Sequence, residues 1–347
     1  MAESKDVQSV AIDDGYADIK TATGDIGQLR TGTFSTNLAR GFRVHTALGA
    51  ETTEDCTGYY VLDDDQRYTA GNWITGEETR FDGFHFSPLN RVAVHHGLHM
   101  SGVDPNRPVR LVCGLPVRAF FHDDGELRKD DIERKRSNLK KAVQRVSGDN
   151  AATIQVTDVE VVPQALAAWM DYAYDDQCRE RDGNESDSAI GVVDVGGRTT
   201  DIAVVIGGSR LDQARSGTEN IGALELMRAL STNLQKRFQF DEPVSRRVCD
   251  RVLASGRMKV FGKSEDVSDI INQARAEISA EIGRAVERFL GAGADLDAVL
   301  FVGGGVAALP EMTKAVRHKP VEIPEPALSN VRGMWKYQKL VDLAEAA

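Results

Sequence analysis

The chain contains the same short pattern twice: an apolar strand that ends in aspartate, a glycine turn and a second strand. The first copy, VAIDDGYADIK, covers residues 10–20, and the second, GVVDVGGRTTDIAVV, covers residues 191–205. A third glycine element, AVLFVGGGVAALPEM, covers residues 298–312. The repeat predicts two halves that open with the same hairpin, and hence a duplicated α/β fold with a cleft between the halves.

The glycines of these elements are suited to an anionic ligand. A phosphate chain is held by backbone N–H groups, so the turn that approaches it must lack side chains. Gly15, the pair Gly196–Gly197 and the triplet Gly303–Gly305 can form such turns. One glycine hairpin alone is usually an ordinary turn, but two acidic hairpins and a triple glycine together favour a nucleotide site.

The aspartates of the two hairpins predict a metal that accompanies the nucleotide. Mg²⁺ prefers oxygen ligands and keeps several of its waters. Asp13 and Asp194 stand at the ends of their strands, where they could hold those waters. Lys20 is the cation that could offset phosphate charge, and Thr199 and Thr200 add hydroxyl donors.

Composition narrows the class of protein. A length of 347 residues suits two domains, and 41% hydrophobic residues suit a globular chain. The net charge of -11 argues against direct binding of nucleic acid, so a role on DNA would need an adaptor. We find no apolar run of membrane-spanning length and no apolar signal segment at the start, and the four cysteines are scattered. A cytoplasmic, reduced protein is expected.

Hydrophobic spacing predicts the other elements. Residues 108–117 are predicted as a buried strand, and residues 129–146 as one amphipathic helix with Ile132, Leu139, Val143 and Val146 on its apolar stripe. Helices are also predicted at residues 89–103, 163–174 with Pro163 in the first turn, 223–238, 268–293 and 330–347. The polar stretch at residues 175–188 is the expected linker.

With these motifs the chain resembles the actin-like ATPase superfamily. IDDGYADIK and DVGGRTTDI look like its two phosphate loops, FVGGGVAAL looks like its adenosine loop, and VVPQALAAW looks like the helix that connects its lobes. AVHHGLHMSGV, VRLVCGLPV and DIERKRSNLKKAV are similar to stretches of the ParM (StbA) family of plasmid-segregation actins. The resemblance implies an actin-like (ribonuclease H-like, duplicated) two-lobed ATPase fold with a central nucleotide cleft. Lobe I is expected at residues 1–182, with a C-terminal helix at 327–347 packing back on it, and lobe II at 183–326.

The resemblance also implies roles for individual residues. Asp13 and Asp194 would orient waters on Mg²⁺, and Gln164 would help to place the attacking water. Nucleotide contacts are expected from Asp14, Gly15, Tyr16, Lys20, Gly196, Gly197, Arg198, Thr199, Gly222, Gly303, Gly304 and Gly305.

Two departures from the ParM pattern affect these expectations. The family commonly has Glu where this chain has Gln164; a neutral amide can orient water but cannot take its proton. Because phosphoryl transfer depends mostly on positioning and electrostatics, Gln164 is compatible with ATP hydrolysis. The family also has small hydroxyl residues where this chain has Tyr16 and Ala17, which leaves backbone N–H groups as donors there.

The implied function is a filament that assembles with ATP, with GTP left open, and falls apart after hydrolysis. In this family the filament separates plasmid copies and is captured by a ParR-like DNA-binding adaptor. The alternatives are a small-molecule phosphotransferase with the same core, a chaperone-type ATPase and a nucleotide-binding filament without turnover. No motif for an acceptor hydroxyl is evident, and no segment that would bind peptides.

Two further features carry less weight. His95 and His99 have a spacing that can chelate a metal, but no carboxylate partner accompanies them or His96, so core or helix-face histidines are expected. ERKRSNLKK is basic but lies on an amphipathic helix among acids, which predicts a solvated face or a contact between subunits rather than nucleic-acid binding.

Overall fold

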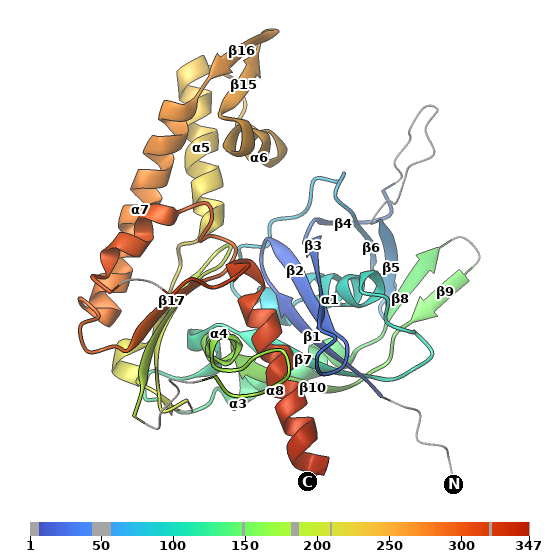
Figure 1. Cartoon of the computed structure of the whole chain (residues 1–347). Coiled ribbons are helices and arrows are strands. Elements are labelled where there is room, and N and C mark those ends of the chain that lie inside the picture. Colours follow the sequence, from blue (N-terminus) through green and yellow to red (C-terminus); the bar gives the residue numbers. More distant parts are fainter. Residues whose placement is uncertain are drawn as a thin grey trace.

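The structure is a computed structural model that describes residues 7–43, 57–147, 150–181, 187–208, 210–318 and 321–346. Two similar sheets form its two lobes (Figure 1). The sheet of lobe I has the order β10–β7–β1–β2–β3 and that of lobe II the order β13–β12–β11–β17, with β14 also paired with β12. Lobe I contains β1 (Gln8–Asp14), β2 (Asp18–Thr23), β3 (Arg30–Ser35), β7 (Val109–Leu115) and β10 (Val156–Pro163). Lobe II contains β11 (Ala189–Val195), β12 (Thr200–Ile206), β13 (Arg210–Leu211), β14 (Gly217–Glu219) and β17 (Ala298–Val302).

Each predicted hairpin has formed and occupies the same place in its sheet. β1 pairs with β2 and β11 pairs with β12 in antiparallel fashion. The first strand of each hairpin then pairs in parallel with a later strand, β1 with β7 and β11 with β17. The strand ends that carry Asp13 and Asp194 therefore have equivalent positions in the two lobes, as the repeat predicts. The expected lobe boundaries at residues 182 and 326 stay predictions.

Two smaller sheets extend the lobes. One beside lobe I has the order β4–β6–β5–β8–β9, and a two-stranded hairpin, β15–β16, lies at the far end of lobe II (Figure 1). Their strands are β4 (Leu38–Arg40), β5 (Gly58–Leu62), β6 (Arg67–Ala70), β8 (Val143–Ser147), β9 (Asn150–Thr153), β15 (Arg257–Val260) and β16 (Lys263–Asp266).

The helices agree with most of the predicted ranges. They are α1 (Pro88–Met100), α2 (Val117–Phe120), α3 (Lys129–Lys140), α4 (Gln164–Ala173), α5 (Ala223–Phe238), α6 (Arg246–Ser255), α7 (Ser268–Leu290) and α8 (Ser329–Ala346). Short 3₁₀ turns are η1 (Phe84–Phe86), η2 (Gln213–Arg215), η3 (Pro310–Ala315) and η4 (Pro326–Leu328). Pro163 is the last residue of β10 and precedes α4, so it lies outside the first turn where we expected it. No helix in the described ranges is long and apolar enough to cross a membrane.

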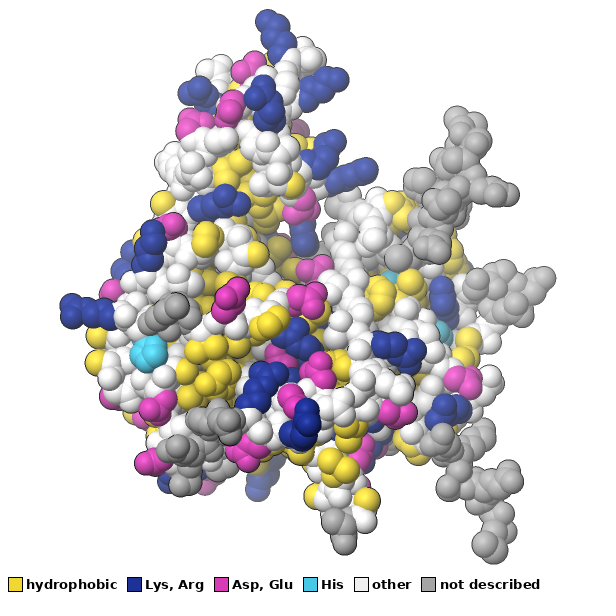
Figure 2. Space-filling model, in the orientation of Figure 1, with side chains coloured by type: hydrophobic (Ala, Val, Ile, Leu, Met, Phe, Trp, Pro, Cys, Tyr) yellow, Lys and Arg dark blue, Asp and Glu magenta, His cyan; other side chains and the backbone are white. Residues whose placement is uncertain are grey.

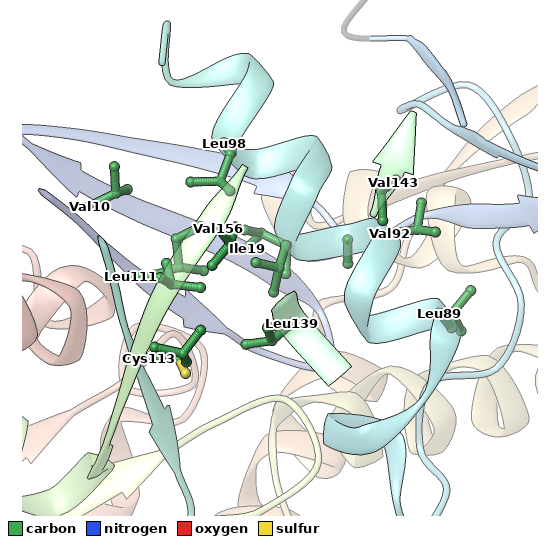
Figure 3. Packing of buried hydrophobic residues seen from close by; sticks show 14 of the residues in the cluster. Val10, Ile19, Leu89, Val92, Leu98, Leu111, Cys113, Leu139, Val143 and Val156 are labelled. Atoms are coloured by element: carbon green, nitrogen blue, oxygen red, sulfur yellow. The ribbon is translucent and has the colours of Figure 1, made fainter. Parts of the chain in front are cut away.

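One predicted helix, residues 129–146, is wrong over its last six residues. α3 ends at Lys140, Lys141 has an extended backbone, and residues 143–147 form β8, which pairs with β5. Figure 3 shows the reason: Leu139 from the end of α3 and Val143 from β8 both lie in the core of lobe I beside α1. Val143 and Val146 are three residues apart, which suits one face of a helix, but in β8 they point to opposite faces and only Val143 is buried. The β-branched side chains favour the strand.

The expected linker at residues 175–188 is also partly wrong. Asp175–Arg181 form a tight turn in which the Asp175 carboxylate accepts from the backbone N–H groups of Gln177 and Arg179. The backbone N–H of Gly27 donates to the carbonyl of Asp176, which attaches this turn to lobe I. Residues 182–186 of the predicted linker lie outside the described residues.

Helices α4 and α8 pack against each other at very close range between the two sheets (Figure 1). α4 lies on the sheet of lobe II through Ala165, Ala168 and Trp169. α8 lies on the sheet of lobe I through Val331, Met334 and Trp335. At the crossing, a Cβ on Gly333 would overlap the carbonyl oxygen of Ala167, so only glycine permits this approach.

We expect Gly333→Ala to destabilise the protein by about 3 kcal/mol, because the overlap is with backbone and the helices must move apart. Gly283→Ala is the matched control, since Gly283 also lies inside a helix but an added Cβ would sit 3.5 Å from the Cβ of Ala315, an ordinary contact. The control gains helix propensity of about 0.5–1 kcal/mol. Urea unfolding of both variants checks the prediction, and equal stability of the two would contradict it.

Candidate functional site

A cleft between the lobes gathers most of the predicted site residues. The predicted residues that line the cleft are Asp13, Gly15, Tyr16, Lys20, Gln164, Asp194, Gly196, Gly197, Thr199, Gly303, Gly304 and Gly305. Asp14, Arg198 and Gly222 are described but are not among its lining residues. The two hairpin turns approach closely there: a Cβ on Gly197 would lie 3.2 Å from the Cβ of Ala17. The duplicated motif thus supplies both walls of one cleft.

Lys20 neutralises Asp13 within the first hairpin. The register of β1 and β2 places the two residues directly opposite each other, and Lys20 Nζ lies 2.9 Å from Asp13 Oδ2. Burial disfavours the charged ammonium, but attraction by Asp13, Asp194 and Asp18 outweighs it, so the pKa of Lys20 is raised. Gln164, the first residue of α4, donates from Nε2 to the other oxygen of Asp13 at 3.1 Å. Lys20 therefore stays charged at the bottom of the cleft.

Asp194 has a neutral partner that the sequence analysis missed. Asn330, the second residue of α8, donates from Nδ2 to Asp194 Oδ2 at 2.7 Å. Burial is the main cause that raises the pKa of Asp194 to about 6, and the negative charge of Asp13 adds to it. No local signal in the sequence points to Asn330, which lies 136 residues from Asp194.

Asp201 is a second missed residue of the cleft. It lies on β12 of lobe II, and its Oδ1 accepts from the backbone N–H of Val117 in lobe I at 2.9 Å and from the Thr218 hydroxyl. Burial, together with the charge of Asp194, raises its pKa to about 7. The sequence did carry a signal for this residue, since Asp201 is the second acid of the DVGGRTTD motif. The Asp201 carboxyl lines the cleft and connects the two lobes there.

The glycines of the site serve different purposes. The backbone N–H of Gly196 donates to the Thr199 carbonyl at 2.8 Å, so this N–H closes the turn itself. Gly222 packs under that turn, where a Cβ would lie 2.6 Å from the carbonyl oxygens of Gly196 and Gly197. Gly303 has a φ of +91°, and a Cβ there would overlap the Asp194 carboxylate. Gly304 has open space on its Cβ side, so the third loop leaves the cleft unobstructed at that point.

Arg198 links the lobes at the mouth of the cleft. Its Nη2 lies 2.7 Å from Asp82 Oδ1, and its guanidinium lies 5.6 Å from the centroid of the Tyr16 ring. Arg80 and Glu225 form a second ion pair between the lobes at 3.3 Å. Tyr16, which departs from the family pattern, thus contributes its ring to a contact between the two hairpins.

Asp14 faces away from the cleft, because neighbouring residues of a strand point to opposite faces. Its carboxylate is fully buried against Lys135, whose Nζ lies 2.8 Å from both oxygens, and against Asn90 and His85. Burial alone would raise the pKa of Asp14, but Lys135 outweighs it and holds the pKa at about 2. The prediction of a solvated basic face on α3 is therefore wrong for Lys135.

His95 and His96 of α1 are core residues, whereas His99 is half-buried. His96 Nδ1 lies 2.8 Å from the Tyr60 hydroxyl, and His95 Nε2 lies 3.3 Å from the Leu139 carbonyl oxygen. Burial lowers the pKa of each to about 4.

The donor set of the cleft fits a magnesium ion that is bound through water. Asp13 and Asp194 offer carboxylate oxygens, the ligand type that Mg²⁺ prefers, from the two facing turns. Among the described residues, no group of three or more His, Cys, Asp and Glu side chains is arranged to hold a metal by itself. The ion would therefore complete its shell with water and phosphate oxygens.

Comparison with known proteins agrees with this architecture. Residues 8–175 match the family model described as plasmid segregation protein ParM, N-terminal, and residues 192–315 match that of the archaeal actin homologue MreB-like, C-terminal. No curated protein sequence matches the chain. The fold and the cleft define a two-domain actin-like protein. More particularly, its N-terminal domain is of the ParM/StbA type and its C-terminal domain is MreB-like, which confirms the resemblance predicted from the sequence.

Solved structures match over almost the whole chain. The archaeal actin homolog Ta0583 superposes with a TM-score of 0.76 at 18% identity, covering 98% of this chain and 100% of its own. Its complex with ADP has a TM-score of 0.73 at 18% identity, with coverage of 98% and 100%. A ParM from a 15-stranded filament of Clostridium botulinum has a TM-score of 0.72 at 16% identity, with coverage of 96% and 99%. These values confirm the actin-like fold.

We expect Asp201→Asn to remove part of the pH dependence of stability. A carboxyl whose pKa rises from 3.8 to about 7 on folding stabilises the folded state below pH 3.8, and this contribution is lost as the pH rises towards 7. The wild type should therefore lose about 2 kcal/mol through Asp201 between pH 5.5 and 8, and the variant should not. Urea unfolding at both pH values checks this. Asp123→Asn, at an exposed carboxyl, should behave like the wild type; an unchanged pH dependence in Asp201→Asn would contradict the prediction.

Proposed function

We propose that this protein is an actin-like ATPase that polymerises on ATP binding, disassembles after hydrolysis and thereby segregates plasmid DNA. The observation that carries the proposal is the convergence of Asp13, Asp194 and Gln164 on one cleft between two lobes. The likeness to actin-like proteins supports nucleotide binding and assembly into a filament. In this proposal lobe I is 1–182 with the helix 327–347, and lobe II is 183–326.

The proposed chemistry is phosphoryl transfer to water, in which positioning and electrostatics do most of the work. Gln164 uses its Nε2 to donate to Asp13, so its Oε1 is oriented by that bond and would accept from the attacking water. Lys20 would balance the charge of the phosphates beside Asp13. Mg²⁺, held through water by Asp13 and Asp194, would neutralise developing charge on the phosphate oxygens.

Hydrolysis would change the filament because the cleft is shared by both lobes. A γ-phosphate between the turns at Gly15 and Gly197 would touch lobe I and lobe II together, and its loss would remove contacts that favour closure. The ion pairs Arg198–Asp82 and Arg80–Glu225 also join the two lobes across the cleft. A ligand shifts such an equilibrium only through different affinity for its two states, and a shared phosphate has that property.

The relatives support self-assembly, and the net charge of the chain supports the need for an adaptor. The Clostridium botulinum ParM forms a 15-stranded filament, and Ta0583 has been crystallised with ADP. The net charge of -11 makes direct DNA binding unfavourable, so DNA would be reached through a ParR-like adaptor in the cytoplasm. ATP is the proposed nucleotide, with GTP as the alternative.

Light scattering with pelleting, together with released phosphate, tests the proposal. The protein is mixed with Mg²⁺ and ATP, ADP, GTP or a non-hydrolysable ATP analogue. We expect scattering to rise with ATP, to decay as phosphate appears and to persist with the analogue. A flat trace at high protein concentration, with turnover only when a small acceptor is added, would support the phosphotransferase alternative instead.

We expect Gln164→Ala to slow phosphate release at least tenfold while ATP-driven assembly continues, because the amide orients water but adds little to binding. Asp194→Ala should abolish turnover, because it removes the carboxylate that orients the metal. Phosphate release and pelleting are followed in the same samples. Near wild-type hydrolysis by Asp194→Ala would contradict the assignment of the site. Loss of assembly in Gln164→Ala would show that Gln164 has a structural role.

A further inference from the structure

His85 is a buried histidine of the cleft that the proposed chemistry leaves unused. It lies in η1, just before α1, and it is one of the residues that line the cleft. Its side chain is almost fully buried, with 5% of the residue exposed. Its ring meets the ring of Tyr16 edge-on at 5.0 Å between centroids, and Tyr16 follows Gly15 of the first turn. His85 therefore stands next to the turn that is proposed to meet the γ-phosphate.

Asp14 determines which nitrogen of His85 carries the proton. Figure 2 shows Lys, Arg, Asp and Glu side chains spread over the surface in view, whereas those of Asp14 and Lys135 are fully buried. Burial opposes the charge of Asp14, but Lys135 outweighs it, so the pKa of Asp14 is about 2 and its carboxylate can only accept hydrogen bonds. His85 Nδ1 lies 3.2 Å from Asp14 Oδ2, so Nδ1 carries a proton.

The second nitrogen of the His85 ring is unprotonated at neutral pH. Burial lowers the pKa of His85, and the charge of Lys135 lowers it further, against the attraction of Asp14 and Asp13. The ring is therefore neutral at pH 7. Because its one proton is on Nδ1, Nε2 has a free lone pair and acts as an acceptor.

Nε2 of His85 needs a donor. It is buried, and none of the residues that the structure describes forms a hydrogen bond with it. An unpaired buried acceptor costs about 1–3 kcal/mol, so a donor that enters the cleft is favoured beside this nitrogen. A fully ionised phosphate has no proton to donate, whereas a water molecule has two. The ligand that suits His85 in the cleft is therefore water.

His85 and Gln164 belong to one connected cluster beside the cleft. Lys135 Nζ bonds to the Asp14 carboxylate, which holds His85, and also donates to the Gly114 carbonyl at 2.6 Å. Gly114 in turn packs against Gln164, since a Cβ on Gly114 would lie 2.6 Å from Gln164 Cγ. Both His85 and Gln164 also line the cleft. The buried cluster thus presents two side chains to the same cleft.

We propose that His85 is the proton acceptor of the hydrolysis step, with Asp14 fixing the tautomer that leaves Nε2 free. The Gln164 amide can orient the attacking water but cannot take its proton, which leaves the role of base open. An imidazole whose other nitrogen is held by a carboxylate is an effective base in acyl transfer, and the same pairing is present here. The inference rests on the proposed function and adds a catalytic residue to it.

The proposed step accounts for both hydrogens of the attacking water. The water donates one hydrogen bond to Gln164 Oε1 and the other to His85 Nε2. The water oxygen forms a bond to the γ-phosphorus, and the bond from this phosphorus to the bridging oxygen breaks, with its electron pair leaving on ADP. The water proton passes to Nε2, and the Asp14 carboxylate stabilises the imidazolium. The imidazolium then releases the proton to solvent, which restores the neutral ring.

His85→Asn tests the proposal, because the amide nitrogen of Asn can keep the bond to Asp14 while Nε2 is lost. Single-turnover hydrolysis at saturating ATP should slow at least tenfold. Affinity for the non-hydrolysable ATP analogue, and assembly with it, should be unchanged.

His95→Gln is the matched control. His95 is also buried, and its Nδ1 has no partner among the described residues, but His95 does not line the cleft. The amide nitrogen of Gln can keep the bond from His95 Nε2 to the Leu139 carbonyl. This variant should hydrolyse ATP like the wild type.

Nitrogen-15 NMR of the histidine rings checks the tautomer directly. The signals that disappear in His85→Asn identify His85, and in the wild type at pH 7 they should show the proton on Nδ1. A proton on Nε2, wild-type hydrolysis by His85→Asn, a loss of analogue affinity that matches the loss of rate, or equal slowing of His95→Gln would each overturn the inference while the proposed function stands. If the wild type does not hydrolyse ATP, the proposed function and the inference fail together.

Discussion

Charge balance between two buried carboxylates is the constraint on which the site depends. Asp13 and Asp194 face one cleft from two lobes, and burial makes each charge costly. Lys20 supplies a cation from the opposite strand of the first hairpin. Gln164 and Asn330 supply amide donors from α4 and α8, one to each aspartate. The two helices that lie between the sheets thus also satisfy the acids of the cleft.

The position of α8 is fixed by interactions outside the cleft. Asp171 of α4 pairs with Lys336 at 2.7 Å and with Arg332 at 2.6 Å, and both of these cations belong to α8. The pair of helices crosses at Gly333 with almost no space between them. Since Asn330 lies one turn earlier on α8, this packing decides whether its amide reaches Asp194. Stability and nucleotide chemistry are therefore coupled through one helix crossing.

Local patterns predicted much of this fold, and the exceptions have a common cause. The hairpins and the long amphipathic helices α5 and α7 formed as expected, since their signals are repeated within one element. Residues 141–146 form an extended segment and part of a strand instead of continuing the predicted helix, because β5 offers a pairing partner and the core of lobe I receives Val143. Lys135 was predicted to lie on a solvated face but is buried, because it pairs with the buried carboxylate of Asp14 on a strand that is distant in the sequence. Such choices depend on neighbours that are remote in the sequence.

The sequence by itself determined the hairpins, and with them the opposition of Asp13 and Lys20, because a short turn fixes the register of its two strands. It also determined where the backbone can approach a ligand, since glycine alone leaves that space. Only the tertiary structure decided that Asn330 serves Asp194 and that Asp201 accepts from Val117, over 136 and 84 residues. The physical reason is that these contacts follow from how whole elements pack, and packing reflects shape and burial over the entire core.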